Sequence, residues 1–188
     1  MLSLLISVSA KSESSQAEIF IENFTQTIFK IISDKEASNE KVLTSLTLEI
    51  KKNIDLEYIC NFVIGRKWKN ASPEFQQRFF KLYENYIIGL YAPQFKGYNG
   101  ESYKIIKTEE IRKNRFSSHL VFILQNKTHL NITIYFIRNK NNEFKIVDVT
   151  GEGISLIASQ REEFSATINM YGLEYFIESF QEKVQRNQ

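Results

Sequence analysis

Apolar positions recur at helical spacing along the first third of the chain. Over 19–32 they return every three or four residues, which is one stripe of an amphipathic helix. After a polar break, a second segment over 42–50 shows a similar apolar pattern. Asp55 is placed to cap a short third helix, which Gly65 would end. The pattern therefore predicts three helices up to Gly65.

A fourth helix is predicted to begin at Ser72-Pro73. Ser72 suits the N-cap, and Pro73 suits the first turn, where its missing N–H costs no hydrogen bond. The helix would run to about Ala92, where Pro93 stops it. Its apolar side would be strongly aromatic and would carry Phe75, Phe79, Phe80, Tyr83, Ile87, Leu90 and Tyr91.

From about Ser102 the hydrophobic period changes from helical spacing to two. We expect strands at 102–111, 117–126, 129–138 and 143–150. The connections are short, so neighbouring strands should be antiparallel. The third strand alternates between apolar and polar residues, which indicates one buried face and one partly wet face. The second strand is apolar on both faces, as expected near the middle of a covered sheet.

The sheet should end at 151–153, where two glycines flank Glu152. Ser155 can then cap a helix, which Gly172 would break before a final helix over 173–180. The order of elements is helices, an antiparallel meander, then helices. It predicts an α+β fold in which a four-stranded antiparallel meander sheet packs against helices.

Composition narrows the class of protein. The chain has 188 residues, a formal net charge of +2, 43% hydrophobic and 24% charged residues, which is typical of a folded chain. Its length fits one domain. The small net charge argues against an extended nucleic-acid surface. Aromatic residues are unusually frequent at 13%, and they supply apolar area for a core or for a ligand pocket.

The first ten residues, 1–10, form a short apolar stretch that ends in Val8-Ser9-Ala10. Small residues in this pattern resemble the end of a secretory signal, although a basic start is missing. We expect a truncated signal peptide over 1–10 and a flexible N-terminus over 11–16. The alternative is that these residues begin an ordinary first helix.

The chain has few residues of the types that commonly act in catalysis or metal binding. The only cysteine, Cys60, lies in an apolar run and is expected to be a buried, inert thiol. His119 and His129 flank a turn between strands, which favours surface positions over catalysis. Asp148 lies in an alternating run, where a structural carboxylate is favoured over a general base. We find no nucleotide-binding, zinc-protease or nucleophile-elbow motif, and we expect no metal and no cofactor.

Basic residues cluster at 66–69 and at 112–115. Solvated loop charge is the favoured interpretation, and contact with anionic head groups or an acidic partner is the alternative. For the apolar residues, periodicity alone favours a plain core over a ligand cavity.

Two longer motifs change that balance. The residues over 63–79 read VIGRKWKNASPEFQQRF, those over 148–156 read DVTGEGISL, and QREEF follows at 160–164. Together with Gly-Leu-Glu at 172–174, they resemble the signatures of the MlaC-type toluene-tolerance family, and the resemblance covers nearly all of 17–185. This range would be a single lipid-binding domain.

The motifs depart from the family pattern at a few positions. Lys67 stands where the family usually has an aromatic residue, and Gln160 stands where it often has Tyr. Thr150-Gly151 replaces the usual residues before Glu152. These departures concern the detail of the pocket rather than the family.

The resemblance implies a periplasmic phospholipid carrier of Gram-negative bacteria, with acyl tails in an apolar cavity between the sheet and the helices. It implies two partners, an outer-membrane lipoprotein complex and an inner-membrane ABC transporter complex with an MCE-domain subunit, and a role in outer-membrane lipid asymmetry. We expect a monomer without catalytic residues that binds no nucleic acid. Two alternatives stay open: a small α+β enzyme that uses Asp148 and a tyrosine on an apolar substrate, or a structural adaptor with a solid core.

The resemblance also directs the choice of site residues. Arg161 would steer a phosphate head group or form a structural pair with Glu152 or Asp148, and we favour the pair. Trp68 would be either a plug below the pocket or part of its wall. The acyl tails are expected to contact Phe79, Tyr83, Ile87, Tyr91, Leu124, Ile132, Ile134, Phe136 and Leu156.

Overall fold

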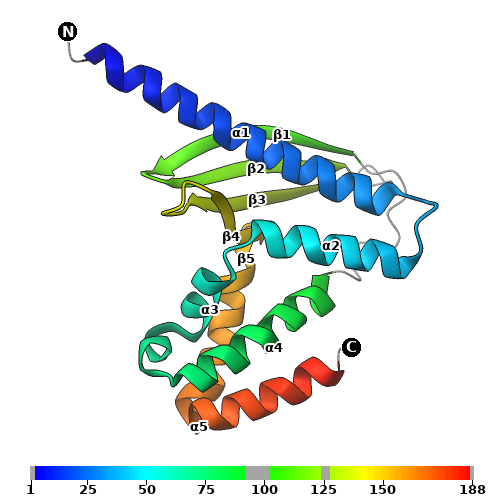
Figure 1. Ribbon diagram of the computed structural model, residues 1–188, viewed down its shortest axis with the longest axis vertical. Coiled ribbons are helices and arrows are strands. Elements are labelled where there is room, and N and C mark those ends of the chain that lie inside the picture. Colours follow the sequence, from blue (N-terminus) through cyan, green and yellow to red (C-terminus); the bar gives the residue numbers. More distant parts are fainter. Residues whose placement is uncertain (1–2, 92–101, 124–127, 187–188) are drawn as a thin grey trace. The chain divides into compact units, whose positions relative to one another are not determined.

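The computed structural model describes residues 3–91, 102–123 and 128–186 (Figure 1), with backbone only for 3–14 and Tyr91. The chain divides into two compact units, and each unit takes two stretches of sequence. The first comprises Met1–Ile54 with Tyr98–Gly153, and the second comprises Asp55–Gly97 with Ile154–Gln188. The expectation of one lipid-binding domain over 17–185 stays a prediction.

The first unit combines two helices with an antiparallel meander. Hydrogen-bonded neighbours follow the sequence order β1-β2-β3-β4-β5. The pairs β1–β2, β2–β3 and β3–β4 are all antiparallel, as the short connections predicted. Its elements are α1 (Ser3–Ser33), α2 (Asn39–Asn53), β1 (Ser102–Arg112), β2 (Arg115–Ile123), β3 (His129–Arg138) and β4 (Phe144–Gly151).

Among the residues that the structure describes, the sheet has five strands, so the prediction of four was wrong. The fifth strand, β5, contains only Ile154–Ser155. It follows a turn in which Glu152 and Gly153 both have positive φ, of 48° and 80°. Two consecutive residues with positive φ form the tight turn that suits a β-hairpin. A strand of two residues is too short for hydrophobic alternation to reveal it.

The first helix is longer than the apolar stripe over 19–32 predicted. α1 runs back to Ser3, so the backbone of most of 1–10 and all of 11–16 is helical. The export signal and the flexibility expected for these residues stay predictions. No helix within the described ranges is both long and apolar enough to cross a membrane.

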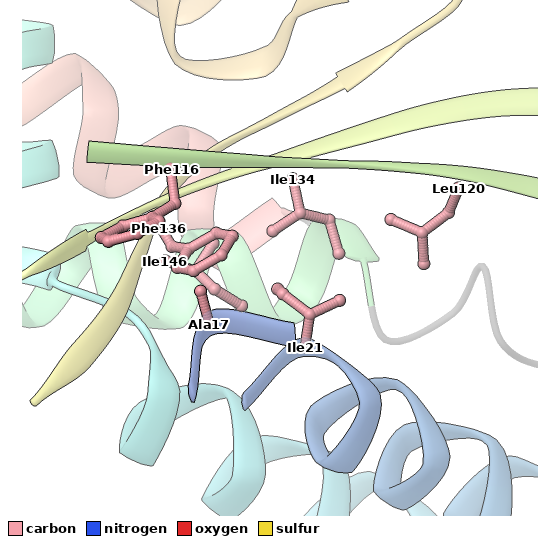
Figure 2. Packing of buried hydrophobic residues seen from close by; sticks show 7 residues of the cluster. All are labelled: Ala17, Ile21, Phe116, Leu120, Ile134, Phe136 and Ile146. Atoms are coloured by element: carbon pink, nitrogen blue, oxygen red, sulfur yellow. The ribbon is translucent and has the colours of Figure 1, made fainter. Parts of the chain in front are cut away.

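The core of the first unit lies where α1 crosses the sheet (Figure 2). The small side chain of Ala17 lets the helix approach closely, and Ile21 follows one turn later on the same face. Both are fully buried against alternate residues of the strands. Ile21 and each large strand side chain of the cluster contribute about 1.5–3 kcal/mol when they are fully buried. The strand residues of this cluster are Phe116, Leu120, Ile134, Phe136 and Ile146.

The described part of the second unit is mainly helical, and its capping residues act as predicted. The side chain of Asp55 accepts the Tyr58 N–H at 2.9 Å. Ser72 accepts the Phe75 N–H at 3.1 Å, and α4 begins at the next residue, Pro73. Its helices are α3 (Leu56–Ile64), the 3-10 helix η1 (Gly65–Asn70), α4 (Pro73–Tyr91) and α5 (Leu156–Arg186).

Gly172 divides α5 into two segments, drawn in orange and red in Figure 1. Its φ of 85° and ψ of 176° belong to a region that only glycine populates readily. The predicted helix break at this residue is therefore confirmed. The Ser155 hydroxyl caps the start of the first segment by accepting the Ala158 N–H at 3.1 Å.

Candidate functional site

Apolar side chains on the α1-facing side of the sheet form rows that run across the strands. One row pairs Tyr103 with Phe122 and Phe122 with Leu130. The next row pairs Leu120 with both Ile105 and Ile132. Leu120 is fully buried, whereas the other five side chains are only half-buried. We call these six residues the apolar rows.

The strand residues of the core beneath α1 are buried more deeply than the five half-buried residues of the apolar rows. Phe116 and Phe136 pair across β2 and β3, and their rings stack at a centroid distance of 5.4 Å. Their exposed fractions are 1% and 0%. One face of the sheet therefore passes from a closed core at this pair to half-buried apolar surface at the Tyr103 row.

Aromatic rings of α1 and the sheet meet at the half-buried end. The Phe29 ring lies 4.4 Å from that of Tyr103 and 5.5 Å from that of Phe122, between centroids. Burial, with a smaller contribution from Glu22, raises the pKa of Tyr103 above its usual value. The rings of Phe29 and Phe122 thus give the Tyr103 side chain a partly apolar environment.

The predicted site residues on the strands occupy different positions. Ile134 and Phe136 belong to the closed core under α1, with exposed fractions of 6% and 0%. Ile132 packs against the edge of that core and keeps part of its surface. Leu124 lies outside the described residues. The alternation predicted for the third strand, with one apolar face, is confirmed.

The predicted residues of α4 lie mainly inside the core of the second unit. Phe79 is fully buried, and its ring stacks at 5.3 Å on the ring of Tyr83, which is also fully buried. Ile87, one turn further, is half-buried, and the side chain of Tyr91 lies outside the described residues. Five other ring centroids lie 5.6–6.2 Å from that of Phe79, namely those of Trp68, Phe75, Phe164, Phe176 and Phe180.

One residue assigned to the apolar side of α4 was placed wrongly. Phe80 is 38% exposed, whereas Tyr86, which the pattern did not select, is 6% exposed. Phe79, Tyr83 and Tyr86 follow the spacing of one helix face, and Phe80 lies a residue away from it. Leu156, at the start of α5, is half-buried.

A polar pair is enclosed in the aromatic core of the second unit. The Tyr83 hydroxyl donates a short hydrogen bond to Oε1 of Gln160. Gln160 is 7% exposed and occupies the position where the resembling family often has Tyr. The glutamine therefore has a structural partner inside the aromatic core.

Arg161 makes structural contacts. Its Nη1 donates to the Phe62 carbonyl at 3.0 Å, and its guanidinium lies 4.9 Å above the Phe62 ring. This carbonyl is one of the last of α3, where a cation is favoured by the helix dipole. Glu152, its expected partner, accepts the Asn131 N–H at 2.7 Å. These contacts favour a structural role for Arg161, in a different form from the predicted pair.

Lys67 and Trp68 also have structural positions in η1. The Lys67 Nζ donates to the Ile168 carbonyl at 3.1 Å, in the last turn before Gly172. The Trp68 ring meets the edge of Phe79 at 6.1 Å, and its carbonyl accepts a bond from Gln76. The half-buried Trp68 ring thus packs on the aromatic core, and whether it is a plug or part of a pocket wall stays a prediction.

A groove of about 320 Å³ runs between α4 and the second segment of α5. Arg78 on its wall is paired at 2.7 Å with Glu178, and it also donates to Gln181 at 2.7 Å. Five of its seven lining residues carry a polar or charged group, and none of the predicted site residues lines it. The lining residues are Arg78, Lys81, Leu82, Asn85, Gln181, Val184 and Gln185.

Sequence reasoning missed part of the apolar surface. Phe29, Tyr103, Ile105 and Phe122 were not selected, although all four belong to segments predicted correctly as helix or strand. The period-two pattern of β1 would have indicated Tyr103 and Ile105, which lie on one face before a register shift at Ile106. The predicted cavity draws on residues of both units, and it stays a prediction.

Comparison with known proteins gives three results. The family model described as "MlaC protein" matches residues 22–182. The Haemophilus influenzae protein named "Intermembrane phospholipid transport system binding protein MlaC" is 26% identical over 163 residues, covering 81% of this chain and 76% of that protein. The structure of a phospholipid-binding protein from Ralstonia solanacearum, in complex with a phospholipid, has a similar fold.

That structural match has a TM-score of 0.81 at 16% sequence identity, and it covers 91% of this chain and 98% of the other. At this identity the likeness concerns the fold. The α+β architecture is therefore shared with a known protein. The family match extends over most of the chain, including both motifs that suggested the resemblance. The chain belongs to the MlaC family.

Proposed function

We propose that this protein is a periplasmic phospholipid carrier that holds acyl tails in an apolar cavity. The family match supports the phospholipid cargo, as does the name of the Haemophilus relative. The fold is also that of a protein whose structure contains a phospholipid. In this proposal the carrier shuttles lipid between an outer-membrane lipoprotein complex and an inner-membrane transporter complex, and so maintains outer-membrane lipid asymmetry.

The observation that best supports the proposal is the change in burial along one sheet face. Deep in the first unit, Phe116 and Phe136 close the core. Further along, Tyr103, Phe122 and Ile132 keep apolar surface in contact with that core. A plain structural core would leave little reason for aromatic residues to stay half-buried together. A partly open apolar layer suits an acyl tail that must be bound and released.

Binding of this kind needs burial rather than catalysis. Each CH₂ group removed from water stabilises a complex by about 0.8 kcal/mol, so two acyl tails amount to roughly 20 kcal/mol. A membrane offers the tails nearly the same gain. The free energy with which a carrier binds the tails must therefore be close to that of the membrane, so that lipid can be both taken up and released. Dispersion contacts with half-buried side chains meet this need without a charged residue.

The burial of the predicted residues suggests how they would share this task. Ile132, Ile87 and Leu156 keep partly exposed apolar surface and would contact the tails directly. Ile134 and Phe136 would support the layer from beneath, because they are already packed against α1. Phe79 and Tyr83 would support the α4 side in the same way, within their own aromatic core.

The first test is the lipid content of the full chain purified without detergent. Native mass spectrometry with solvent extraction should find a bound mass near that of a diacyl phospholipid. The empty protein should also take up phospholipid from vesicles. A protein that carries no lipid and takes up none from vesicles would contradict the proposal.

Two substitutions with the same chemistry locate the site. Ile132→Asp places a carboxylate in the apolar rows and should reduce the fraction of lipid-loaded protein by about tenfold or more, because each unpaired charge is costly in an apolar site. Ile106→Asp on β1 is the matched control, since Ile106 is 57% exposed. Both variants should remain folded by circular dichroism. Equal lipid content in the two variants would argue against the apolar rows.

Transfer between the two complexes needs a separate measurement. A fluorescent phospholipid loaded on the purified chain should pass to vesicles that contain the inner-membrane transporter complex faster than to vesicles without it. The same assay with the outer-membrane lipoprotein complex tests the second partner. Equal rates with and without each complex would leave the protein a lipid-binding protein without that partner.

A further inference from the structure

Three large side chains stand exposed together at the bend of α5. Met170, Tyr171 and Tyr175 have exposed fractions of 72%, 58% and 54%. The rings of the two tyrosines lie 4.7 Å apart between centroids. Exposed apolar residues that occur singly are ordinary, whereas a cluster of them marks a surface with a role. We call these three residues the kink patch.

The backbone conformation of Gly172 keeps the kink patch exposed to solvent. Its φ of 85° and ψ of 176° interrupt the helix between Tyr171 and Tyr175. On the other side of the bend, Ile168 and Phe176 are buried at 2% and 3% exposure. These two buried side chains therefore hold the bend in place, while the three residues of the kink patch stay exposed.

Basic residues lie beside the kink patch. The Lys67 Nζ donates to the Ile168 carbonyl at 3.1 Å, which brings η1 against the turn that precedes Met170. Arg66 and Lys69, on the same short helix, are also exposed. Two carboxylates, Glu174 and Glu178, lie in the turns that follow Gly172, and the hydrogen bond from Arg78 to Glu178, with a smaller effect of Glu174, raises the pKa of the Arg78 guanidinium. Arg78 pairs with Glu178, so the three cations of η1 outnumber the other carboxylate, that of Glu174.

We propose that the kink patch and η1 form a surface that docks the protein on anionic lipid bilayers. Tyrosine is favoured at the level of lipid head groups, because its ring is apolar and its hydroxyl reaches water. Lysine and arginine near an anionic leaflet each add attraction that salt weakens. Charge complementarity thus selects an anionic membrane rather than a neutral one. The inference concerns the outer surface of the second unit and holds whether or not the chain carries lipid.

Vesicle flotation of the full chain tests this docking surface. Vesicles of phosphatidylglycerol mixed into phosphatidylcholine should bind the protein at low salt, whereas pure phosphatidylcholine vesicles should bind it weakly. Raising the salt concentration should release it. The double variant Tyr171→Ser/Tyr175→Ser should weaken binding by about tenfold or more, because apolar contact with the interface is lost.

A second variant separates the charges from the rings. Arg66→Gln/Lys69→Gln should weaken binding by about fivefold for each cation removed. It spares Lys67, whose amine supports the end of a helix. Leu48→Ser is the matched control, because Leu48 is 64% exposed on α2 and should not affect binding. If the tyrosine variant fails to fold, the charge variant still tests the surface.

The proposal is overturned if the protein ignores anionic vesicles at low salt. It is also overturned if both variants bind like the unmodified chain. Self-association that is lost in Tyr171→Ser/Tyr175→Ser, without vesicle binding, would assign the patch to a second copy of this chain instead. Mass spectrometry of the same samples reports lipid held by the protein, so a failed carrier and a failed docking surface give different results.

Discussion

The guanidinium of Arg161 lies over the backbone of Gly65. A Cβ added at Gly65 would come within 3.1 Å of the Arg161 Nη2, and Gly65 has a φ of +70°, which side chains of L residues rarely adopt. The same guanidinium bonds the Phe62 carbonyl at 3.0 Å. The first segment of α5 thus closes the end of α3, and glycine is required there both for its φ and for its missing side chain.

Gly65→Ala should lower the free energy of unfolding by about 1–3 kcal/mol, because the backbone is strained and Arg161 is displaced. Gly153→Ala is the matched control, since Gly153 also has positive φ, of +80°, but no atom within 4 Å of an added Cβ. Urea denaturation monitored by circular dichroism measures both. An equal loss in the two variants would mean that the contact with Arg161 contributes nothing.

Arg161→Lys should destabilise the protein by about 1–3 kcal/mol, because an ammonium cannot both reach the Phe62 carbonyl and stack on its ring in the same way. The lipid content of the folded variant should be unchanged. Thermal unfolding and mass spectrometry report the two properties separately. Loss of phospholipid at unchanged stability would instead assign Arg161 to the head group.

Tyr83→Phe should cost about 1–3 kcal/mol, because Gln160 loses the phenol as a partner inside the core. Adding Gln160→Leu to this variant should recover much of the loss, since no polar group then remains unpaired at that position. Tyr175→Phe, at an exposed tyrosine, is the control and should change little. A double variant no more stable than Tyr83→Phe would show that the pair is not the source of the effect.

Acid should weaken the contact between Arg78 and Glu178. The hydrogen bond from Arg78, together with its charge, holds the pKa of Glu178 below the ordinary value of 4.5. A lowered folded-state pKa adds stability that is present above the unfolded value and is lost as the pH falls through the folded value. The free energy of unfolding in urea, measured from neutral pH to about pH 3, should therefore fall less steeply in Glu178→Gln than in the unmodified chain.

Arg78→Gln provides the second arm of this test. It should flatten the same part of the pH profile, and the double variant should flatten it no further. Both side chains are substantially exposed, so salt should reduce the effect. A profile that is unchanged in either single variant would contradict the assignment.

The Cys60 thiol should be unreactive in the folded protein. Burial raises its pKa well above the usual range, with a smaller contribution from Glu57. Because the thiolate is the reactive form, labelling with a thiol reagent should be slow in buffer and rapid in urea. Prompt labelling of the folded chain would mean that the second unit opens readily around α3.

Local chemistry in the sequence was sufficient to predict where three of the helices begin. Asp55, Ser72 and Ser155 each accept a backbone N–H at the start of a helix, as their residue types and positions predicted. These signals act within one turn of the chain, so no distant contact is needed to read them. The two-residue strand β5 and the N-terminal part of α1 lie beyond such signals. The strand β5 is too short to show a hydrophobic period, and the N-terminal part of α1 has no clear start signal in the sequence.

The sequence by itself determined which side chains share a face. Ile132 and Ile134 lie two residues apart on β3, and the strand period places both on the same side of the sheet. Only the tertiary structure decided that Ile134 is closed beneath α1 while Ile132 keeps apolar surface. The difference arises because burial depends on where another element crosses, and Ala17 sets that crossing from a distant part of the chain. Periodicity assigns a face, and packing decides how much of it is left for a ligand.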